Sequence, residues 1–262
     1  MNPIENIKLF LFDMDGTLYL GDRLYPFTDN LLKSIRQKGG RYLFMTNNSS
    51  KSVNAYMDKL EKLGIHADKG DFITSSQATA YYLKKHHNGK KLYVCGTKSL
   101  VEELEEEGFA VTTNLEDVEC VVAGFDTELT FQKLWDVSKL LTNPDLPYIA
   151  TNPDLVCPTE FGSVPDCGSM CISIENATGR VPVVIGKPSP LMPQLAMEKW
   201  GVAKEETAVI GDRIYTDIKC GLNAGILSIL VMSGETTQEI MEQSPDKPHL
   251  VMQDASEILQ YL

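Results

Sequence analysis

The stretch IKLFLFDMDGTLY, residues 7–19, decides how the rest of the chain is interpreted. Residues 7–12 form a short, mainly apolar run, which is typical of a strand that is buried on both faces. The run ends at Asp13, and a second carboxylate, Asp15, and Gly16 follow at once. We therefore predict a buried strand whose carboxyl end carries two acidic side chains.

Three later apolar runs end in polar segments in the same way. These polar segments are TNNSS at 46–50, GKPSP at 186–190 and GDRIYTD at 211–217. Helical patterns alternate with the apolar runs along the chain, which is typical of an α/β fold with a parallel sheet. Because the carboxyl ends of parallel strands face one crevice, we expect the polar segments to converge there with Asp13.

The side chains that would meet at this crevice suit a phosphate group and a divalent cation. The acidic members are Asp13, Asp15, Asp212 and Asp217. Such crowding of negative charge is unfavourable without a cation, and carboxylates with no His or Cys near them in sequence suit Mg²⁺. Thr46, with the backbone N–H groups that follow it, and Lys187 would bind an anion. Since carboxylates are established covalent nucleophiles, two of them could divide the roles of nucleophile and general acid/base.

Each polar segment also has a structural explanation when it is taken alone. The segment from Asp13 is not an EF-hand calcium loop, because its sixth and twelfth positions are Leu18 and Leu24. Thr46 could cap a helix, and so could Asp212, while the Lys-Pro pair at 187–188 could form a surface turn. Four such segments at equivalent strand ends favour a functional site over four separate coincidences.

The segments DMDGTL, TNN, GKP and GDRxxTD, in this order and spacing, resemble the haloacid-dehalogenase-like (HAD) phosphohydrolases. Together with ATNPD at 150–154, they resemble most the NagD-like or 4-nitrophenylphosphatase branch. The resemblance implies a Mg²⁺-dependent phosphatase that hydrolyses small phosphate monoesters through an aspartyl phosphate. Nucleoside monophosphates, sugar phosphates, phosphoglycolate and pyridoxal phosphate are all candidate substrates. The implied fold is a doubly wound, Rossmann-like parallel-sheet core with an inserted α/β cap domain.

The resemblance also implies a role for each residue of the core segments. Asp13 would attack phosphorus, and Asp15 would protonate the leaving alkoxide and then deprotonate the hydrolytic water. Thr46 and the backbone amide of Asn47 would bind phosphoryl oxygens, while Lys187 would neutralise charge on Asp13 and on the phosphoryl group.

The implied Mg²⁺ ligands come from three of the acidic residues. They are the carboxylate of Asp13, the main-chain carbonyl of Asp15 and the carboxylate of Asp212. Asp217 would support this set from close by, without being a ligand itself.

The spacing of the segments locates an inserted domain. Only 32 residues separate Asp13 from Thr46, which is enough for one helix and one strand, whereas 140 residues separate Thr46 from Lys187. We therefore predict a catalytic core formed by 1–79 and 181–262, with a cap at 80–180. The resemblance implies that this cap closes over the pocket and selects the leaving group.

Residues 152–168, rich in Pro and Gly, are predicted to form a long loop, and loops of such length are usually functional. Its candidates for substrate contact are Asn152, Asp154, Glu160, Phe161 and Asp166. Turn-stabilising hydrogen bonds of the polar members are an equally good explanation. Relatives often have Pro-Gly-x-Gly before the next helix, whereas this chain has Pro-Asp-Cys-Gly at 165–168.

The overall composition restricts the classes of partner. The net charge of −12 disfavours nucleic acids and anionic membranes, so we expect a small-molecule phosphate ester as the partner. The chain shows no signal peptide, no apolar run long enough to span a bilayer and no C-x-x-C pair, which favours a cytoplasmic protein with reduced cysteines. A monomer and a homodimer both agree with the sequence.

Two other functions use the same nucleophile. A haloacid dehalogenase would attack carbon through Asp13, but it requires neither Mg²⁺ nor a second acid, so Asp15 and Asp212 argue against it. A non-catalytic phospho-aspartate switch resembling response-regulator receivers would be about half as long and would lack the cap-sized insertion.

Overall fold

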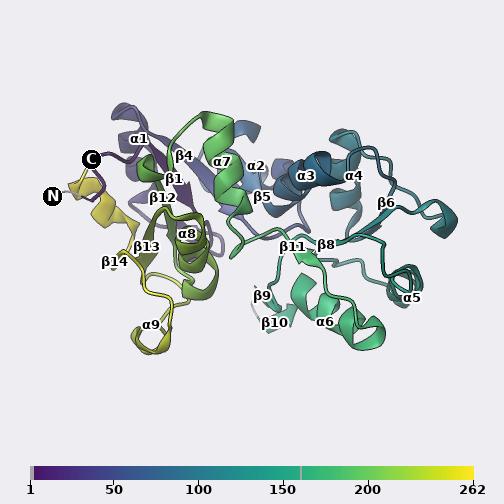
Figure 1. The fold of residues 1–262 in the computed structure, drawn as a ribbon. Coiled ribbons are helices and arrows are strands. Elements are labelled where there is room, and N and C mark those ends of the chain that lie inside the picture. The colour runs from purple at the N-terminus through teal and green to yellow at the C-terminus, as the bar shows by residue number, and fades with distance from the viewer. Residues whose placement is uncertain (1–2, 160) are drawn as a thin grey trace. The chain divides into compact units, whose positions relative to one another are not determined.

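The computed structural model describes residues 3–159 and 161–262, which form two compact units (Figure 1). The first unit comprises the described parts of Met1–Thr46, Val53–Ile73 and Lys187–Leu262. The second comprises Asn47–Ser52 and the described parts of Thr74–Gly186. The range 80–180, predicted for the inserted domain, lies within the second unit.

The first unit is built on a six-stranded sheet with the order β14-β13-β12-β1-β4-β5. The strands are β1 (Leu9–Phe12), β4 (Arg41–Thr46), β5 (Phe72–Thr74), β12 (Thr207–Gly211), β13 (Leu227–Val231) and β14 (Leu250–Met252). The central strand β1 pairs in parallel with both β4 and β12, and β13 and β14 continue the parallel pairing. This arrangement confirms the predicted α/β class with a parallel sheet.

The register of β1 brings three strand ends to the same level. Phe12 is aligned with Phe44 on one side and with Ile210 on the other. Asp13, which follows Phe12, therefore lies beside the ends of β4 and β12. The polar segments that follow these three strands are thus placed together at the carboxyl ends of the strands.

Strand β1 is buried on both of its faces, as its continuous apolar sequence predicts. Phe10 and Phe12 pack in a cluster with Phe44 and Phe72, and each of the four is at most 1% exposed. Burial of one such side chain contributes about 1.5–3 kcal/mol. The same burial fixes the register of β1 and therefore the position of Asp13.

Five α-helices lie in the first unit among its described residues. They are α1 (Thr28–Gln37), α2 (Val53–Lys62), α7 (Leu191–Trp200), α8 (Lys219–Ala224) and α9 (Gln238–Gln243). The helix α1 buries Leu31, Leu32 and Ile35, whose spacing of three and four residues produces one apolar face.

The second unit has its own four-stranded parallel sheet, with the order β11-β8-β7-β6. Its strands are β6 (Leu92–Cys95), β7 (Cys120–Ala123), β8 (Tyr148–Ala150) and β11 (Val183–Val184). Its helices are α3 (Ser75–His86), α4 (Lys98–Glu106), α5 (Phe131–Leu140) and α6 (Cys167–Thr178). Thr74, Thr97 and Thr130 cap the first three of these helices, because each hydroxyl accepts a backbone N–H of the first turn.

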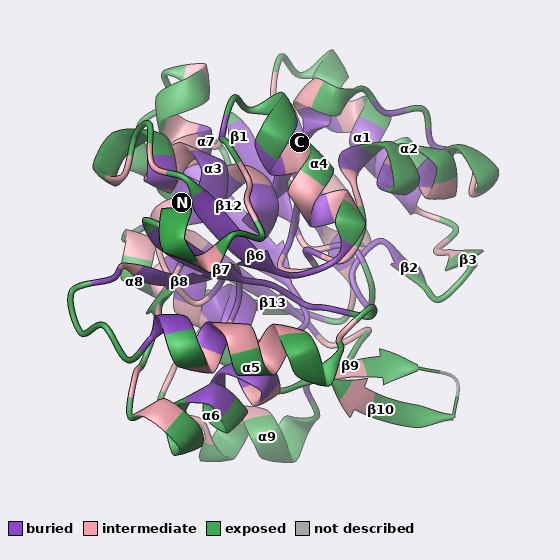
Figure 2. Ribbon diagram, turned by 90° about the vertical axis from the view of Figure 1, so that its right-hand side faces the viewer, coloured by how far each residue is buried: buried purple, intermediate pink, exposed green. Residues whose placement is uncertain are grey.

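The prediction of one long loop over residues 152–168 is wrong. A β-hairpin forms there from β9 (Val156–Thr159) and β10 (Gly162–Pro165), and α6 begins at Cys167. Gly162 has a φ of 138°, which permits the sharp reversal into β10. The hairpin is mostly exposed, in contrast to the buried strands β6, β7 and β8 (Figure 2).

Several predicted elements differ in type or length. The predicted helix 215–223 is a π-helical turn, Ile214–Ile218, followed by the short α8. The predicted strand 109–112 is reduced to one bridge, between Val111 and Leu92. The hairpin β2 (Tyr19–Leu20) with β3 (Arg23–Leu24), the helix α9 and the edge strand β14 have no counterpart in the prediction.

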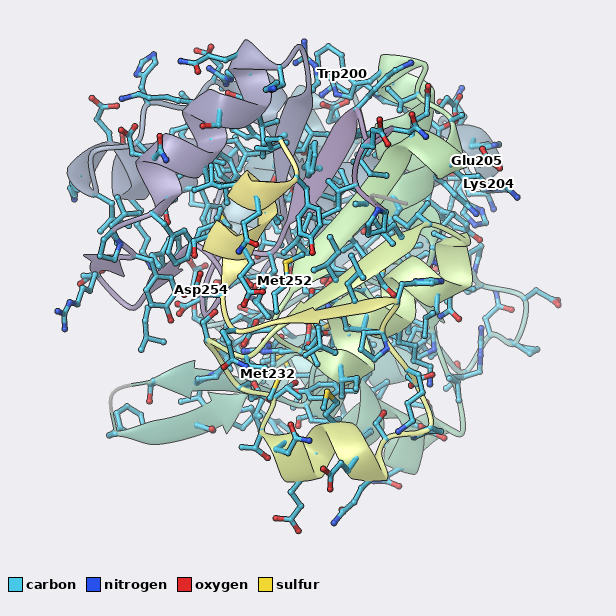
Figure 3. The ribbon with its side chains drawn as sticks, turned by 90° about the vertical axis from the view of Figure 1, so that its left-hand side faces the viewer. Trp200, Lys204, Glu205, Met232, Met252 and Asp254 are labelled. Carbon is cyan, nitrogen blue, oxygen red and sulfur yellow. The ribbon has the colours of Figure 1, made fainter. Side chains whose placement is uncertain are left out.

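The end of the chain follows β14, the edge strand of the first unit's sheet (Figure 3). Met252 is buried there, and the carboxylate of Asp254 accepts the backbone N–H of Ser256 at 2.8 Å. This bond begins a 3₁₀ helix, Ala255–Gln260, where the prediction has a helix from about residue 256. Ala255 and Ile258 of that helix are fully buried.

None of the helices within residues 3–159 and 161–262 has both the length and the hydropathy of a membrane span. All six cysteines lie in these ranges, and none of them takes part in a disulfide. The Sγ atoms of Cys167 and Cys171, one turn apart on α6, are 3.9 Å from each other.

Candidate active site

The ammonium group of Lys187 joins three of the predicted site segments. Its Nζ donates to Asp13 Oδ1 at 2.6 Å, to Asp217 Oδ1 at 2.6 Å and to the carbonyl of Met45 at 3.2 Å. Met45 precedes Thr46, so these bonds connect the ends of β1 and β4 with the turn after β12. The predicted convergence of the polar segments at one edge of the sheet is therefore observed within the first unit.

Lys187 is held in its charged form by its neighbours. Its side chain is almost completely buried, and burial lowers the pKa of a lysine. The charges and hydrogen bonds of Asp13 and Asp217 outweigh burial and raise the pKa of Lys187 overall. A buried ammonium with three acceptors is a fixed positive charge beside the Asp13 carboxylate.

Three carboxylates form a compact group, and two of them, Asp13 and Asp217, bind this ammonium. Asp13, Asp212 and Asp217 each offer an oxygen within 4.8 Å of the others. Burial raises the pKa of Asp212 to about 7, and the negative charges of Asp13 and Asp217 add to the effect. Burial likewise raises the pKa of Asp217 to about 6, although Lys187 acts against it. The group therefore carries more negative charge than one lysine compensates.

One oxygen of Asp212 has no hydrogen-bond partner among the residues that the structure describes. Oδ2 accepts the backbone N–H of Glu235 at 2.7 Å, whereas Oδ1 is buried and unpaired. Buried carboxylate oxygens almost always have a partner, so an unpaired one facing two further carboxylates fits a bound cation. Hard oxygen donors with no His or Cys in the group suit Mg²⁺.

Two glycines allow the backbone to approach Asp212 closely. A Cβ atom at Gly16 would lie 2.5 Å from Asp212 Oδ2, and one at Gly234 would lie 2.0 Å from the same atom. Gly16 also has a φ of 82°, which disfavours any other residue. Thr236 donates its backbone N–H to the carbonyl of Asp212 at 3.2 Å. The loops at residues 16 and 234–236 therefore fix the direction of this carboxylate.

The π-helical turn after β12 aims Asp217 into the site. The carbonyl of Arg213 accepts the backbone N–H groups of both Asp217 and Ile218, which widens the turn. Asp217 Oδ2 in turn accepts the backbone N–H of Arg213 at 3.1 Å, while Oδ1 faces Lys187. Both oxygens of a fully buried carboxylate are thereby satisfied.

Asp15 has a different environment from these three carboxylates. Its side chain is exposed, and Oδ1 accepts the backbone N–H of Gly21 at 3.3 Å. Partial burial raises the pKa of Asp15 above its ordinary value, with a smaller contribution from the charge of Asp13. A raised pKa favours the protonated form of Asp15, the form that a general acid needs.

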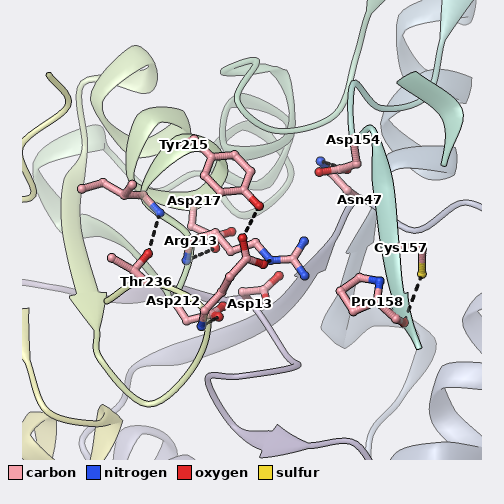
Figure 4. A network of polar contacts seen from close by, with 12 residues as sticks. Asp13, Asn47, Asp154, Cys157, Pro158, Asp212, Arg213, Tyr215, Asp217 and Thr236 are labelled. Carbon is pink, nitrogen blue, oxygen red and sulfur yellow. Dashed lines mark hydrogen bonds and ion pairs between the residues drawn. The ribbon is translucent and has the colours of Figure 1, made fainter. Parts of the chain in front are cut away.

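A second chain of polar contacts surrounds the site and was not predicted (Figure 4). Arg213 Nε lies 2.8 Å from Glu235 Oε2, and the hydroxyl of Tyr215 donates to the other oxygen of Glu235. Arg213 and Tyr215 belong to the segment GDRIYTD, which could have drawn attention to them. No pattern in the sequence marks Glu235 or Thr236.

The residues predicted as possible substrate contacts of the second unit hydrogen-bond to one another. Asn152 Nδ2 donates to Asp154 Oδ2 at 2.9 Å and to Asp166 Oδ1 at 3.0 Å. Asn47 Nδ2 also donates to Asp154 Oδ2, at 2.7 Å, and Asp166 accepts the backbone N–H of Cys167 at the start of α6. Contact of these residues with a substrate stays a prediction.

The other two candidates for substrate contact in residues 152–168 are Phe161 and Glu160. Phe161 is 83% exposed, at the tip of the hairpin. Glu160 lies outside the described residues.

Models of known protein families match two stretches of the chain. The model described as haloacid dehalogenase-like hydrolase matches residues 10–110, and one described as HAD-hydrolase-like matches residues 184–258. The chain is also 33% identical to the 5′-nucleotidase YutF of Bacillus subtilis, over 99% of this chain and 100% of the relative.

Solved structures with the same fold include a 4-nitrophenylphosphatase and a NagD protein. The 4-nitrophenylphosphatase of Thermotoga maritima has a TM-score of 0.94 and 40% identity, with 99% of each chain covered. NagD of E. coli K-12 has a TM-score of 0.88 and 31% identity, covering 96% of this chain and 98% of its own.

A third structure is described with a metal. It is a glycerol phosphate phosphatase of Mycobacterium tuberculosis in complex with magnesium, with a TM-score of 0.89 and 29% identity over 97% of this chain and 78% of that one. Sequence identity above 30% over nearly the whole length, together with the observed fold, confirms the resemblance. The chain belongs to the haloacid-dehalogenase-like hydrolases, and among them it is a NagD-like phosphatase.

Proposed function

We propose that the protein hydrolyses small phosphate monoesters in a Mg²⁺-dependent reaction that passes through an aspartyl phosphate on Asp13. The observation that carries the proposal is the group of Asp13, Asp212 and Asp217 around Lys187, in which Asp212 Oδ1 is buried and unpaired. Such a group holds a nucleophilic carboxylate beside one fixed cation, the Lys187 ammonium. Its remaining negative charge suits a second cation.

The covalent steps follow from the placement of Asp13 and Asp15. A carboxylate oxygen of Asp13 attacks phosphorus, and the bond from phosphorus to the leaving oxygen breaks. Asp15, whose raised pKa favours its protonated form, gives its proton to that oxygen. Water then attacks phosphorus and returns a proton to Asp15, and the release of inorganic phosphate restores the Asp13 carboxylate.

The charges around phosphorus are met by neighbouring groups of the chain. Lys187 would neutralise one phosphoryl oxygen while it stays beside Asp13. Thr46, at the end of β4, and the backbone N–H of Asn47 would bind another phosphoryl oxygen. Asp13 and Asp212, with the carbonyl of Asp15, would hold Mg²⁺, and Asp217 would support them. When bound, Mg²⁺ would stabilise the negative charge that develops on the phosphoryl oxygens.

The relatives support small phosphate esters as substrates. Their names refer to nucleotides, to sugar phosphates and to nitrophenyl phosphate, and a phosphoglycolate phosphatase is also among them. These leaving groups differ widely, whereas the chemistry at phosphorus is the same. We therefore propose that the core residues fix the reaction and that the second unit contributes to the selection of the leaving group.

A phosphate-release assay tests the proposal. The purified protein is offered a panel of nucleoside monophosphates, sugar phosphates, phosphoglycolate and an aryl phosphate, with Mg²⁺ and with a chelator. We expect release that depends on Mg²⁺ and is lost by at least about a thousandfold in Asp13→Asn. No release from any ester, or activity that persists in the variant, would contradict the proposal.

A matched variant controls for loss of structure. Asp71 is also a buried aspartate of the first unit, paired with Arg36 at 3.1 Å, and it lies outside the site. We expect Asp71→Asn to keep its phosphatase activity. Full activity after chelation would instead favour the dehalogenase type of chemistry, and a phosphoenzyme stable for minutes without release would favour a switch.

A further inference from the structure

Arg213 lies beside the proposed nucleophile but has no part in the proposed steps. Its Nε is fixed by Glu235 Oε2 at 2.8 Å, and Tyr215 binds the other oxygen of Glu235. The backbone N–H of Glu235 also donates to Asp212 Oδ2. The guanidinium is therefore anchored to the same loop that directs Asp212.

The outer edge of this guanidinium is not used by the described part of the chain. Among the described residues, the hydrogen bonds and ion pairs of the Arg213 side chain run through Nε alone (Figure 4). Only 26% of the side chain is exposed. Burial lowers the pKa of Arg213, but the charges of Asp13 and Glu235 outweigh it and raise the pKa overall. Arg213 thus offers a fixed fork of N–H donors, largely removed from water, within reach of the charge on Asp13.

The phosphoryl group already has other partners in the proposed function. Lys187, the Thr46 segment and the bound cation together account for its three non-bridging oxygens. The two end nitrogens of Arg213 would then be left without an acceptor if the leaving group were neutral. Partly desolvated N–H groups without an acceptor are unfavourable, whereas a second anionic group of the substrate would satisfy them.

We propose that Arg213 binds a second anionic group carried by the leaving group, so that the preferred substrates are phosphate monoesters of small acids. The inference rests on the proposed function and narrows its substrate class. A carboxylate, or a second phosphoryl group, has the pair of oxygens that the guanidinium fork fits. Phosphate esters of neutral alcohols and phenols lack this contact.

Two esters of similar size test the inference. Phosphoglycolate carries a carboxylate where ethyl phosphate carries a methyl group. We expect the wild-type protein to favour phosphoglycolate by about tenfold or more in kcat/KM, the effect of one charge-assisted contact. In Arg213→Gln this ratio should fall by about tenfold, and in Arg213→Lys by less, because the charge stays but the fork is lost.

Two further variants separate the contact from its anchor and from general charge. Glu235→Gln keeps Arg213 but weakens its anchor, and we expect a smaller fall in the ratio than in Arg213→Gln. Arg41→Gln removes another guanidinium of the first unit, which stacks on Trp200 with its Cζ 3.4 Å from the ring centre. We expect this control to keep the wild-type ratio.

Binding measurements provide a readout that does not require turnover. Calorimetric titration with phosphonoacetate and with ethylphosphonate should show about tenfold tighter binding of the acid, and Arg213→Gln should remove the difference. The inference would be overturned if the kcat/KM ratio of phosphoglycolate to ethyl phosphate were unchanged in Arg213→Gln, or if the variant lost equal activity or affinity toward both compounds of a pair. A wild-type preference for ethyl phosphate or ethylphosphonate, which lack the carboxylate, would overturn it as well. If no ester is hydrolysed at all, the proposed function fails, and the two phosphonates still decide the role of Arg213.

Discussion

Each unit places a polar cluster after a buried parallel strand, and the two clusters differ in how well they are satisfied. In the second unit, Asn152 follows β8 and bonds to both Asp154 and Asp166, and Asp166 also caps α6. In the first unit, three carboxylates lie close together, only two of them pair with Lys187, and the buried Oδ1 of Asp212 has no hydrogen-bond partner among the described residues.

This difference indicates the purpose of each cluster. A buried polar group that finds its partners within the fold stabilises the fold. Buried charges that do not balance reduce stability, and a protein keeps them where a ligand completes the set. The raised pKa of Asp212 records this cost, because burial and the charges of Asp13 and Asp217 oppose its ionisation. The core cluster is therefore expected to trade stability for function, and the other cluster is not.

The largest expected effect comes from Asp212→Asn. Loss of this carboxylate removes a proposed cation ligand, so kcat/KM with Mg²⁺ should fall by about a thousandfold, or roughly 4 kcal/mol. The metal-free variant should nevertheless be more stable than the wild type, by roughly 1–2 kcal/mol in urea unfolding, because one crowded charge is gone. If Asp212→Asn had activity close to that of the wild type, or if it were less stable than the wild type without metal, the proposed difference between the two clusters would be contradicted.

The pH dependence of stability should show the same imbalance. The pKa values of Asp212, about 7, and Asp217, about 6, lie above their ordinary 3.8, so the folded protein binds these protons more tightly than the unfolded chain. Their stabilising contribution is complete below about pH 4 and is lost as the pH rises to about 7. The free energy of unfolding of the metal-free protein should therefore fall by a few kcal/mol over this window, relative to Asp212→Asn.

Calorimetry in the presence of a chelator, at several pH values between 4 and 7, measures this difference. Addition of Mg²⁺ should remove most of the fall in the free energy of unfolding between pH 4 and 7, because the cation favours the ionised carboxylates. A difference between wild type and variant that stays constant with pH would show that the core carboxylates are not under charge strain.

The smallest effect is expected in the satisfied cluster. Asp166→Ala removes the cap of α6 and one acceptor of Asn152, so the free energy of unfolding should fall by about 1–2 kcal/mol in urea. Asp145→Ala removes an exposed aspartate of the same unit and should change stability by less than about 0.5 kcal/mol. Equal stability of the two variants would show that the bonds of Asp166 contribute nothing to the fold.

The sequence was sufficient for the parts of the fold that depend on continuous apolar runs. Residues 9–12 and 207–210 are buried on both faces, so their strands, and the ends that carry Asp13 and Asp212, follow from hydrophobicity alone. The convergence of Lys187 on Asp13 follows as well, because parallel strands share one carboxyl edge.

Other features depend on contacts that no local pattern encodes. The exposed hairpin at 156–165 has little apolar alternation, and a Pro at each of two strand positions makes it resemble a loop. The π-helical turn at 214–218 forms because Asp217 binds both the Arg213 backbone and Lys187. Arg213 is close to Asp217 in the sequence, whereas Lys187 is distant from it. The bond from Asn47 to Asp154 joins residues 107 positions apart, and neither residue type specifies its partner.

Chemical trapping tests the role of Asp13 most directly. The reaction with a good substrate and Mg²⁺ is stopped in acid during turnover, and the digested protein is analysed by mass spectrometry. We expect one phosphoryl group on the peptide that contains Asp13, labile to hydroxylamine as an acyl phosphate is, and absent from Asp13→Asn. A phosphoryl group on another residue, or none at any time while phosphate is being released, would contradict the assignment of Asp13 as the nucleophile.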